Sequence, residues 1–331
     1  MSEARDRIRA GTIASRQTLG RLLHRDLGPS PALGPQLDEL KAGEFPPYIP
    51  VPAQGFQLVG QHLTREVSEW SAGINHYIWH GPCDQFRVAH SIIEGGAKWA
   101  SRSYRMRSLN TVEWSAFLDT YPEHDLYWNI AGYNSDPVLK GRFAALFRGL
   151  YFERTGGQNI QLVQIGENRR FEEGFDAVAA GDWTDGGPII VTDLLSRDAG
   201  WLQEGDHVRS AFALSFFESM NNLFLVRVFV DKTMQPASQG CLLIDGHERA
   251  VVKNSVFIGK NMRQPLAKVK RCQEVTFEGC LFQADEGQNH VEIDDAKVTF
   301  IGCLGTARVM SNRQQIGAVH VNATHDRRIQ Q

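Results

Sequence analysis

The sequence predicts an all-β solenoid in which short strands stack repeat upon repeat. Two observations predict this fold class. A hydrophobic pattern typical of strands recurs with a period near 25 residues, and turns rich in Gly, Asn and Asp separate its copies. No amphipathic helix recurs between the strands, so a βαβ sheet is disfavoured. One such repeat cannot bury its apolar face alone, and stacking gives a continuous core.

The clearest copies of the repeat lie near the C-terminus. Residues 250–257 (AVVKNSVF), 275–282 (VTFEGCLF) and 298–305 (VTFIGCLG) each have a small or apolar residue at position one, an apolar residue at position three and Ser or Cys at position six. Further copies are predicted to begin at Phe86, Val112, Ile160, Ile189 and Leu223. Strand alternation then predicts that position three points into the core.

This template makes specific predictions about the interior. Val252, Phe277 and Phe300 are expected in one inward column, and Trp114 is also expected to point inward. Cys280 and Cys303 share position six, so they should lie on neighbouring strands about 4.8 Å apart. Stacked side chains point the same way, and the five cysteines form no CxxC pair, so we expect buried free thiols.

These runs resemble the right-handed parallel β-helix superfamily, which includes pectate and pectin lyases, polygalacturonases, alginate-modifying enzymes and phage tailspikes. The resemblance covers residues 56–322 and rests on the period and on the three runs quoted above. It implies a single-stranded right-handed parallel β-helix solenoid with a ligand groove along the outside of one sheet. It specifies the fold much more strongly than an activity.

The flanking segments predict a short N-terminal helix and a linker. Residues 1–26 contain the best helix of the chain, and residues 27–55 hold seven of the 13 prolines, which indicates an extended linker. The helix has three alternatives: a cap on the first repeat, docking to a partner or around a homotrimer axis, or a frayed tail. Residues 323–331 are expected to be a polar tail.

Residues 166–210 interrupt the regular spacing and predict long loops on either side of a strand near Ile189. Trp183 and Trp201 in these loops are candidate contacts for the apolar face of a sugar. A lyase needs clustered acids for Ca²⁺ and a base beside them. The candidate calcium ligands are Asp182, Asp185 and Asp206, and the candidate bases are Arg209 and His207. Acids in such loops are also common turn formers.

A second strand precedes the aligned one in each repeat, and it predicts an outward column of polar side chains. Counting back through the turns gives Glu153, Glu218, Asp245, Lys270 and Asp294, with an uncertainty of one residue. Two carboxylates about 5 to 9 Å apart suit glycosidic hydrolysis, which makes Glu218 and Asp245 candidate catalytic residues and the others candidate substrate contacts. The alternative is a solvated ladder in which Lys270 pairs with acids on neighbouring repeats.

Composition and missing motifs exclude several classes. The 35 basic and 38 acidic side chains give a net charge of −3, which disfavours partners such as nucleic acid or an anionic membrane. No apolar run predicts a membrane span or a secretory signal, so a cytoplasmic or virion-associated protein is expected. Zinc, nucleotide-binding and serine-hydrolase motifs are absent from the sequence.

The leading functional hypothesis is therefore recognition, with or without cleavage, of a polysaccharide, for example by a virion tail component. A polysaccharide lyase is one alternative. The other is a non-catalytic scaffold that docks through its N-terminal helix. A cleft with two close carboxylates and uncovered aromatic rings would favour sugar chemistry, whereas a ladder of paired charges would favour a scaffold.

Overall fold

The structure is a computed structural model, and the part of the chain that it describes is built from strands. It describes residues 49–50, 54–65, 76–80, 83–95, 99–104, 106–107, 109–118, 124–129, 144–155, 157–163, 189–197, 199, 212–217, 222–233, 240–285 and 287–328. Within these ranges there is no helix, and no helix long and apolar enough to cross a membrane is found there. The predicted N-terminal helix lies outside the described residues.

One sheet has 11 strands in the order β1-β4-β7-β11-β14-β16-β18-β21-β24-β27-β28. Its strands are β1 (Ile49–Pro50), β4 (His76–His80), β7 (Trp99–Tyr104), β11 (His124–Asn129), β14 (Gln158–Val163), β16 (Phe212–Phe217), β18 (Gly240–Asp245), β21 (Ala267–Lys270), β24 (His290–Asp294), β27 (Arg308–Ser311) and β28 (Gln314–Ala318). Each strand up to β27 pairs in parallel with the next.

The second sheet has 18 strands and is also parallel except at its C-terminal end. Its strands are β2 (Gln54–Val59), β3 (His62–Arg65), β5 (Cys83–Ala89), β6 (Ile92–Gly95), β8 (Met106–Arg107), β9 (Leu109–Glu113), β10 (Ala116–Leu118), β12 (Ala144–Arg148), β13 (Tyr151–Glu153), β15 (Ile189–Arg197), β17 (Leu223–Lys232), β19 (Arg249–Lys253), β20 (Val256–Gly259), β22 (Glu274–Glu278), β23 (Leu281–Ala284), β25 (Lys297–Ile301), β26 (Leu304–Gly305) and β29 (Ala323–Asp326).

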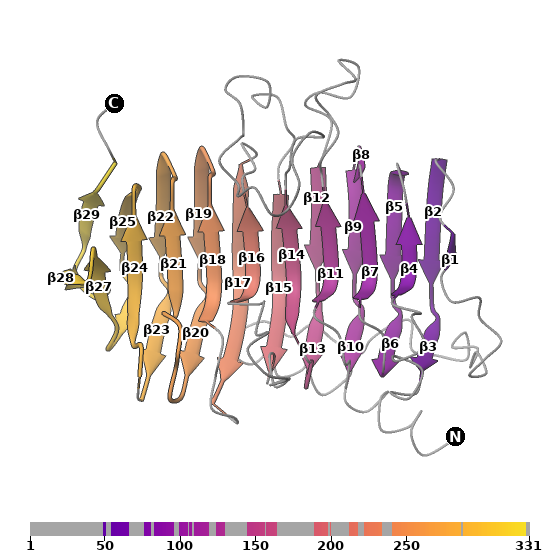
Figure 1. Cartoon of the computed structure of the whole chain (residues 1–331), viewed down its shortest axis with the longest axis horizontal. Helices are drawn as coiled ribbons and strands as arrows, with labels where there is room; N and C mark the ends of the chain where they lie inside the picture. Colours follow the sequence, from indigo (N-terminus) through magenta and orange to yellow (C-terminus); the bar gives the residue numbers. More distant parts are fainter. Residues whose placement is uncertain are drawn as a thin grey trace.

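The chain alternates between the two sheets. After β18 it turns at Gly246 into β19, turns again at Asn254 into β20, and then returns to the 11-stranded sheet as β21. Both corner residues have positive φ, 75° and 48°, a conformation that Gly and Asn adopt most readily. Figure 1 shows the resulting strands side by side along the long axis, from indigo at the N-terminal end to yellow at the C-terminal end.

The core lies between the sheets. It consists of inward-facing side chains that stack in columns, with one side chain from each repeat. Val252 pairs with Phe277 and Phe277 with Phe300, and all three are fully buried, which confirms the predicted inward column. The rings of Phe277 and Phe300 stack with their centroids 5.4 Å apart. Cys280 and Cys303 are buried free thiols, as the sequence predicts, and they lie at the same corner of consecutive repeats, directly before Leu281 and Leu304.

The predicted register is wrong in two N-terminal copies. Ala145 pairs with both Asn110 and Ile189, so this copy begins at Asn110, two residues before Val112. Ile160 belongs to the other sheet, where it pairs with Leu214, because β14 has the same apolar alternation as the aligned strands.

Trp114 consequently lies at a corner and not in the core. Its φ is 49°, and its ring covers Gly149 of the next repeat so closely that a Cβ atom there would lie 1.9 Å from the ring. The guanidinium of Arg148 lies 5.2 Å from the ring centroid. The prediction that Trp114 points inward is therefore wrong.

The ends of the stack differ from the predicted boundaries. Residues 323–326, expected in a polar tail, form β29, which pairs antiparallel with β25. Strand β28 pairs antiparallel with β27 in the same way. The antiparallel strands β29 and β28 thereby cover the edges of β25 and β27, which would otherwise have unpaired backbone groups. At the other end, β1 and the start of β2 lie inside the segment predicted as a linker.

Candidate functional site

Three residues of the predicted polar column lie in register on the 11-stranded sheet. Asp245 at the end of β18 is opposite Lys270 at the end of β21, which is opposite Asp294 at the end of β24. The neighbouring residues Ile244, Val269 and Ile293 are fully buried in the core, so the column faces away from it. The roles of these residues in ligand binding stay predictions.

Glu153 does not belong to this column. It lies on β13 in the 18-stranded sheet, where its register neighbours are Leu118 and Arg197. The sequence misplaced it because the assignment of Ile160 to the wrong sheet shifted the count through the turns. The position opposite Asp245 on the preceding strand is Phe217, and Glu218 lies outside the described residues.

The carboxylate of Asp245 forms an ion pair with Arg271 of the next repeat. Its side chain is only 6% exposed, and its Oδ1 accepts a hydrogen bond of 2.8 Å from Nε of Arg271. Arg271 has a φ of 49°, so it is the corner residue that follows β21. Asp245 and Asp294 are two strand spacings apart, about 9 to 10 Å between Cα atoms, and Lys270 lies between them. That separation is at or beyond the upper limit for paired catalytic carboxylates.

A second row of charges runs beside the first. Lys268 lies opposite Glu292, and its Nζ donates a hydrogen bond of 2.8 Å to Oε1 of Glu292. The two side chains are half-buried. Lys268 and Glu292 therefore form a cross-strand ion pair, and a pair of this kind adds modestly to the stability of the sheet.

His290 at the start of β24 is a candidate that the sequence analysis did not single out. It is buried, and within the described part of the chain its Nδ1 has no hydrogen-bond partner. Burial is the main cause that lowers the pKa of His290. The positive charges of Arg308 and Lys268 lower this pKa further, whereas the negative charge of Glu292 raises it. The imidazole is thus neutral near pH 7 and carries a lone pair, which is the state of a proton acceptor. The only sequence signal for His290 is the alternation of polar and apolar residues along His290–Asp294, which places it at the start of a strand.

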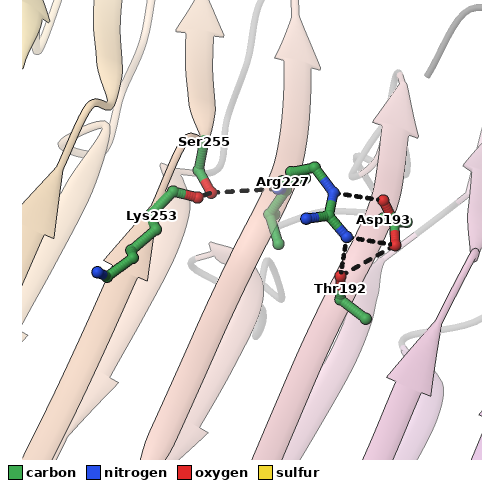
Figure 2. A network of polar contacts seen from close by, with 6 residues as sticks. Thr192, Asp193, Arg227, Lys253 and Ser255 are labelled. Atoms are coloured by element: carbon green, nitrogen blue, oxygen red, sulfur yellow. Dashed lines mark hydrogen bonds and ion pairs between the residues drawn. The ribbon is translucent and has the colours of Figure 1, made fainter. Parts of the chain in front are cut away.

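A buried charge network occupies one corner of the 18-stranded sheet (Figure 2). Nε of Arg227 donates to Oδ1 of Asp193 at 2.6 Å, and its Nη2 donates to Oδ2 at 2.9 Å and to Oγ1 of Thr192 at 3.0 Å. Asp193 is buried, and the hydrogen bond from Arg227 raises the pKa of that guanidinium. Both residues have positive φ, 56° for Asp193 and 55° for Arg227.

The network continues into the next repeat through Ser255. Its Oγ accepts a hydrogen bond of 3.1 Å from the amide of Val228 and donates one of 2.8 Å to the carbonyl of Lys253, as Figure 2 shows for the side chain and its neighbours. Asp193 and Arg227 occupy the corner position that is glycine in other repeats, at Gly149, Gly279 and Gly302. The corner network therefore holds repeats together and has the features of a structural site.

Another charged group lies where β15 and β17 end. Lys232 is buried and donates a 2.6 Å hydrogen bond to the carbonyl of Ala199, while Asp231 lies 3.8 Å from Arg197 and accepts hydrogen bonds from Thr233. Burial is the main cause that raises the pKa of the nearby Cys241 thiol to about 12. The thiol is protonated at neutral pH and is a poor nucleophile.

The remaining candidates lie outside the described residues. They are Glu218, Arg209 and His207 for catalysis, Trp183 and Trp201 for substrate binding, and Asp182, Asp185 and Asp206 for calcium. In the ranges that the structure does describe, no group of three or more His, Cys, Asp or Glu side chains is arranged to hold a metal ion. Calcium binding by the loops stays a prediction.

Comparison with known proteins gives no match. No family model, no curated protein and no solved structure is similar enough to this chain to indicate its family.

Proposed function

We propose that the chain is a right-handed parallel β-helix that serves as a rigid structural element and does not cleave a substrate on its described faces. The in-register parallel pairing of successive repeats supports the β-helix, and parallel strands joined by crossover connections are nearly always right-handed. Continuous ladders on both sheets resist bending because each repeat is hydrogen-bonded to the next.

One observation carries this proposal: Asp245, the candidate catalytic carboxylate that the structure describes, is paired within the chain. Asp245 is buried against Arg271, and Glu292 is bonded to Lys268. A general acid or nucleophile must be free to reach a substrate atom, and a carboxylate that already accepts a hydrogen bond from a guanidinium is occupied. The ladder alternative expected Lys270 to pair with acids on neighbouring repeats, whereas the ion pairs on this face join Asp245 to Arg271 and Glu292 to Lys268.

The proposal is tested by incubating the purified chain with a panel of acidic and neutral polysaccharides. Unsaturated products are followed by absorbance at 235 nm, and hydrolysis by new reducing ends. The proposal predicts neither signal above the buffer control. Product formation that Asp245→Asn abolishes would refute it, since that variant keeps the side-chain shape and removes the charge.

Polysaccharide recognition without cleavage is the second candidate. It is favoured by Lys270, which is half-buried, and Asp294, which is exposed, because they offer hydrogen-bonding groups at strand spacing along one outer face. A virion tail component would use such a face to hold a surface glycan, and the tryptophans at 183 and 201 would then add stacking contacts. A lyase would further require the loop residues Arg209 and His207 and a bound Ca²⁺.

This candidate is tested by glycan binding to Lys270→Ala and Asp294→Ala, with Thr276→Ala on the other sheet as the matched control. Weaker binding by the first two variants alone supports recognition at this face. Absence of binding to every glycan by the parent chain leaves the structural role.

A further inference from the structure

An apolar column runs along the outside of the 18-stranded sheet, on the strands that follow the second corner of each repeat. Register pairing joins Ile92, Ala116, Tyr151, Leu195, Phe229, Val256, Leu281 and Leu304. The alternate residues Phe152, Phe257 and Phe282 are fully buried in the core, so this column faces the opposite side of the sheet.

The exposure of this column changes along its length. The members from Ile92 to Phe229 are buried, Val256 and Leu281 are half-buried, and Leu304 is 66% exposed. The first five members of the column are thus covered, and the last three are not. An aliphatic side chain exposed to this extent marks an interaction surface when others adjoin it.

Other exposed apolar residues do adjoin it. Ile301 is 46% exposed and Val321 is 51% exposed. The amide of Gly302, between Ile301 and Leu304, donates a 2.7 Å hydrogen bond to Oδ1 of Asn322, which brings Val321 to the same corner. The C-terminal apolar patch therefore consists of Val256, Ile258, Leu281, Ile301, Leu304 and Val321.

We infer that the C-terminal apolar patch binds a second copy of this chain. The charges at its edge indicate the occupant. Lys253 and Glu278 occupy the same position in consecutive repeats, just before the corners that lead to Val256 and Leu281, and their side chains are 2.6 Å apart and 43% and 44% exposed.

A two-fold axis parallel to the strands, placed between β20 and β23, reverses the order of repeats in the second copy. Lys253 then faces the second copy's Glu278, and Val256 faces its Leu281. Both contacts occur twice, so the surface is self-complementary in charge and in apolar character, as an isologous dimer requires. This inference does not depend on the proposed structural function.

The test is sedimentation velocity of the full chain over a range of concentrations. The parent chain should dimerise, and Leu304→Asp and Leu281→Asp should each weaken dimerisation by at least about tenfold. Val59→Asp is the matched control, because Val59 is 41% exposed but lies in the first repeat, far along the stack from the patch. Circular dichroism melting curves check that each variant is folded.

Charge reversal gives a second arm that does not depend on the apolar residues. Lys253→Glu and Glu278→Lys should each weaken the dimer, and the double variant should restore it, because it re-forms opposite charges across the axis. A parent chain that is monomeric at every concentration overturns the inference. So does an oligomer that Leu304→Asp leaves unchanged, or one that Val59→Asp weakens equally.

Discussion

Nε of Arg271 lies 2.8 Å from Oδ1 of Asp245, and the two residues come from neighbouring repeats. The contact joins a corner residue to the end of a strand and removes the carboxylate from the predicted groove. It therefore stabilises the stack at the position where a sugar-cleaving β-helix would need a free acid.

This pair should contribute more to stability than the neighbouring one. Arg271→Gln leaves a buried carboxylate without its cation, and we expect a loss of about 1 to 3 kcal/mol in the free energy of unfolding, reduced from the fully buried case because Arg271 is partly exposed. Lys268→Gln breaks the more exposed pair and should cost less than about 1 kcal/mol. Equal costs in urea unfolding would contradict the assignment.

The core register has its own test. Phe277→Ala removes a fully buried ring between Val252 and Phe300 and should cost about 3 to 5 kcal/mol. Thr276→Ala, on the outward side of the same strand, should change the free energy of unfolding by less than about 0.5 kcal/mol. A Phe277→Ala variant with parental stability would show that the ring is not in the core.

The C-terminal repeats were the easiest part to predict from the sequence. The segments that begin at residues 250, 275 and 298 have short turns of equal length, so one template fits them all. Val112 and Ile160 were misassigned because insertions of different length separate the N-terminal strands and because both sheets use the same alternation. Hydrophobic periodicity alone does not distinguish them.

The corner network was not predicted for a related reason. The run from Leu223 to Lys232 has the pattern of one long strand, and its corner at Arg227 carries no Gly or Asn to signal a turn. Asp193 in the preceding repeat is hidden in the same way, and only their register shows that they face each other. His290 was missed because its burial depends on elements far away in the chain.

The network makes a prediction about stability. Asp193→Ala leaves Arg227 without its carboxylate partner and should cost about 2 to 4 kcal/mol, because Asp193 is buried. Asn254→Gly, at the equivalent corner of a later repeat, should change stability by about 0.5 kcal/mol or less, because glycine adopts the same positive φ. Thermal unfolding of the two variants compares them directly, and similar losses would argue against the network.

Acid should weaken the fold through the buried His290 and the half-buried His325. Burial lowers the pKa of His290 and of His325 from the ordinary 6.5, so the unfolded chain binds more protons below that pH. Their contribution to the free energy of unfolding is complete above about pH 6.5 and is lost progressively as the pH falls below the ordinary histidine pKa. His290→Gln and His325→Gln should each flatten the dependence of stability on pH between 7 and 5. An unchanged slope in both variants would exclude these residues as the cause.

Two of the buried thiols, those of Cys241 and Cys272, should be unreactive in the folded chain. Burial is the main cause that raises the pKa of Cys241 and of Cys272 to about 12, so neither carries thiolate near pH 8. Iodoacetamide at pH 8 should label the two residues only after unfolding, as mass spectrometry of tryptic peptides will report. Rapid labelling of Cys272 in the native chain would contradict its burial.

We expect the repeats to form one rigid, continuous parallel stack. Register pairing connects Gln57 in the first described repeat to Thr299 in the last through eight strand spacings. Spin labels on Gln57→Cys and Thr299→Cys, in a Cys83→Ser background, would give their separation by pulsed electron paramagnetic resonance. A rigid stack should give a narrow distribution of distances near about 38 Å. A broad distribution, or a mean shorter than about 30 Å, would contradict it.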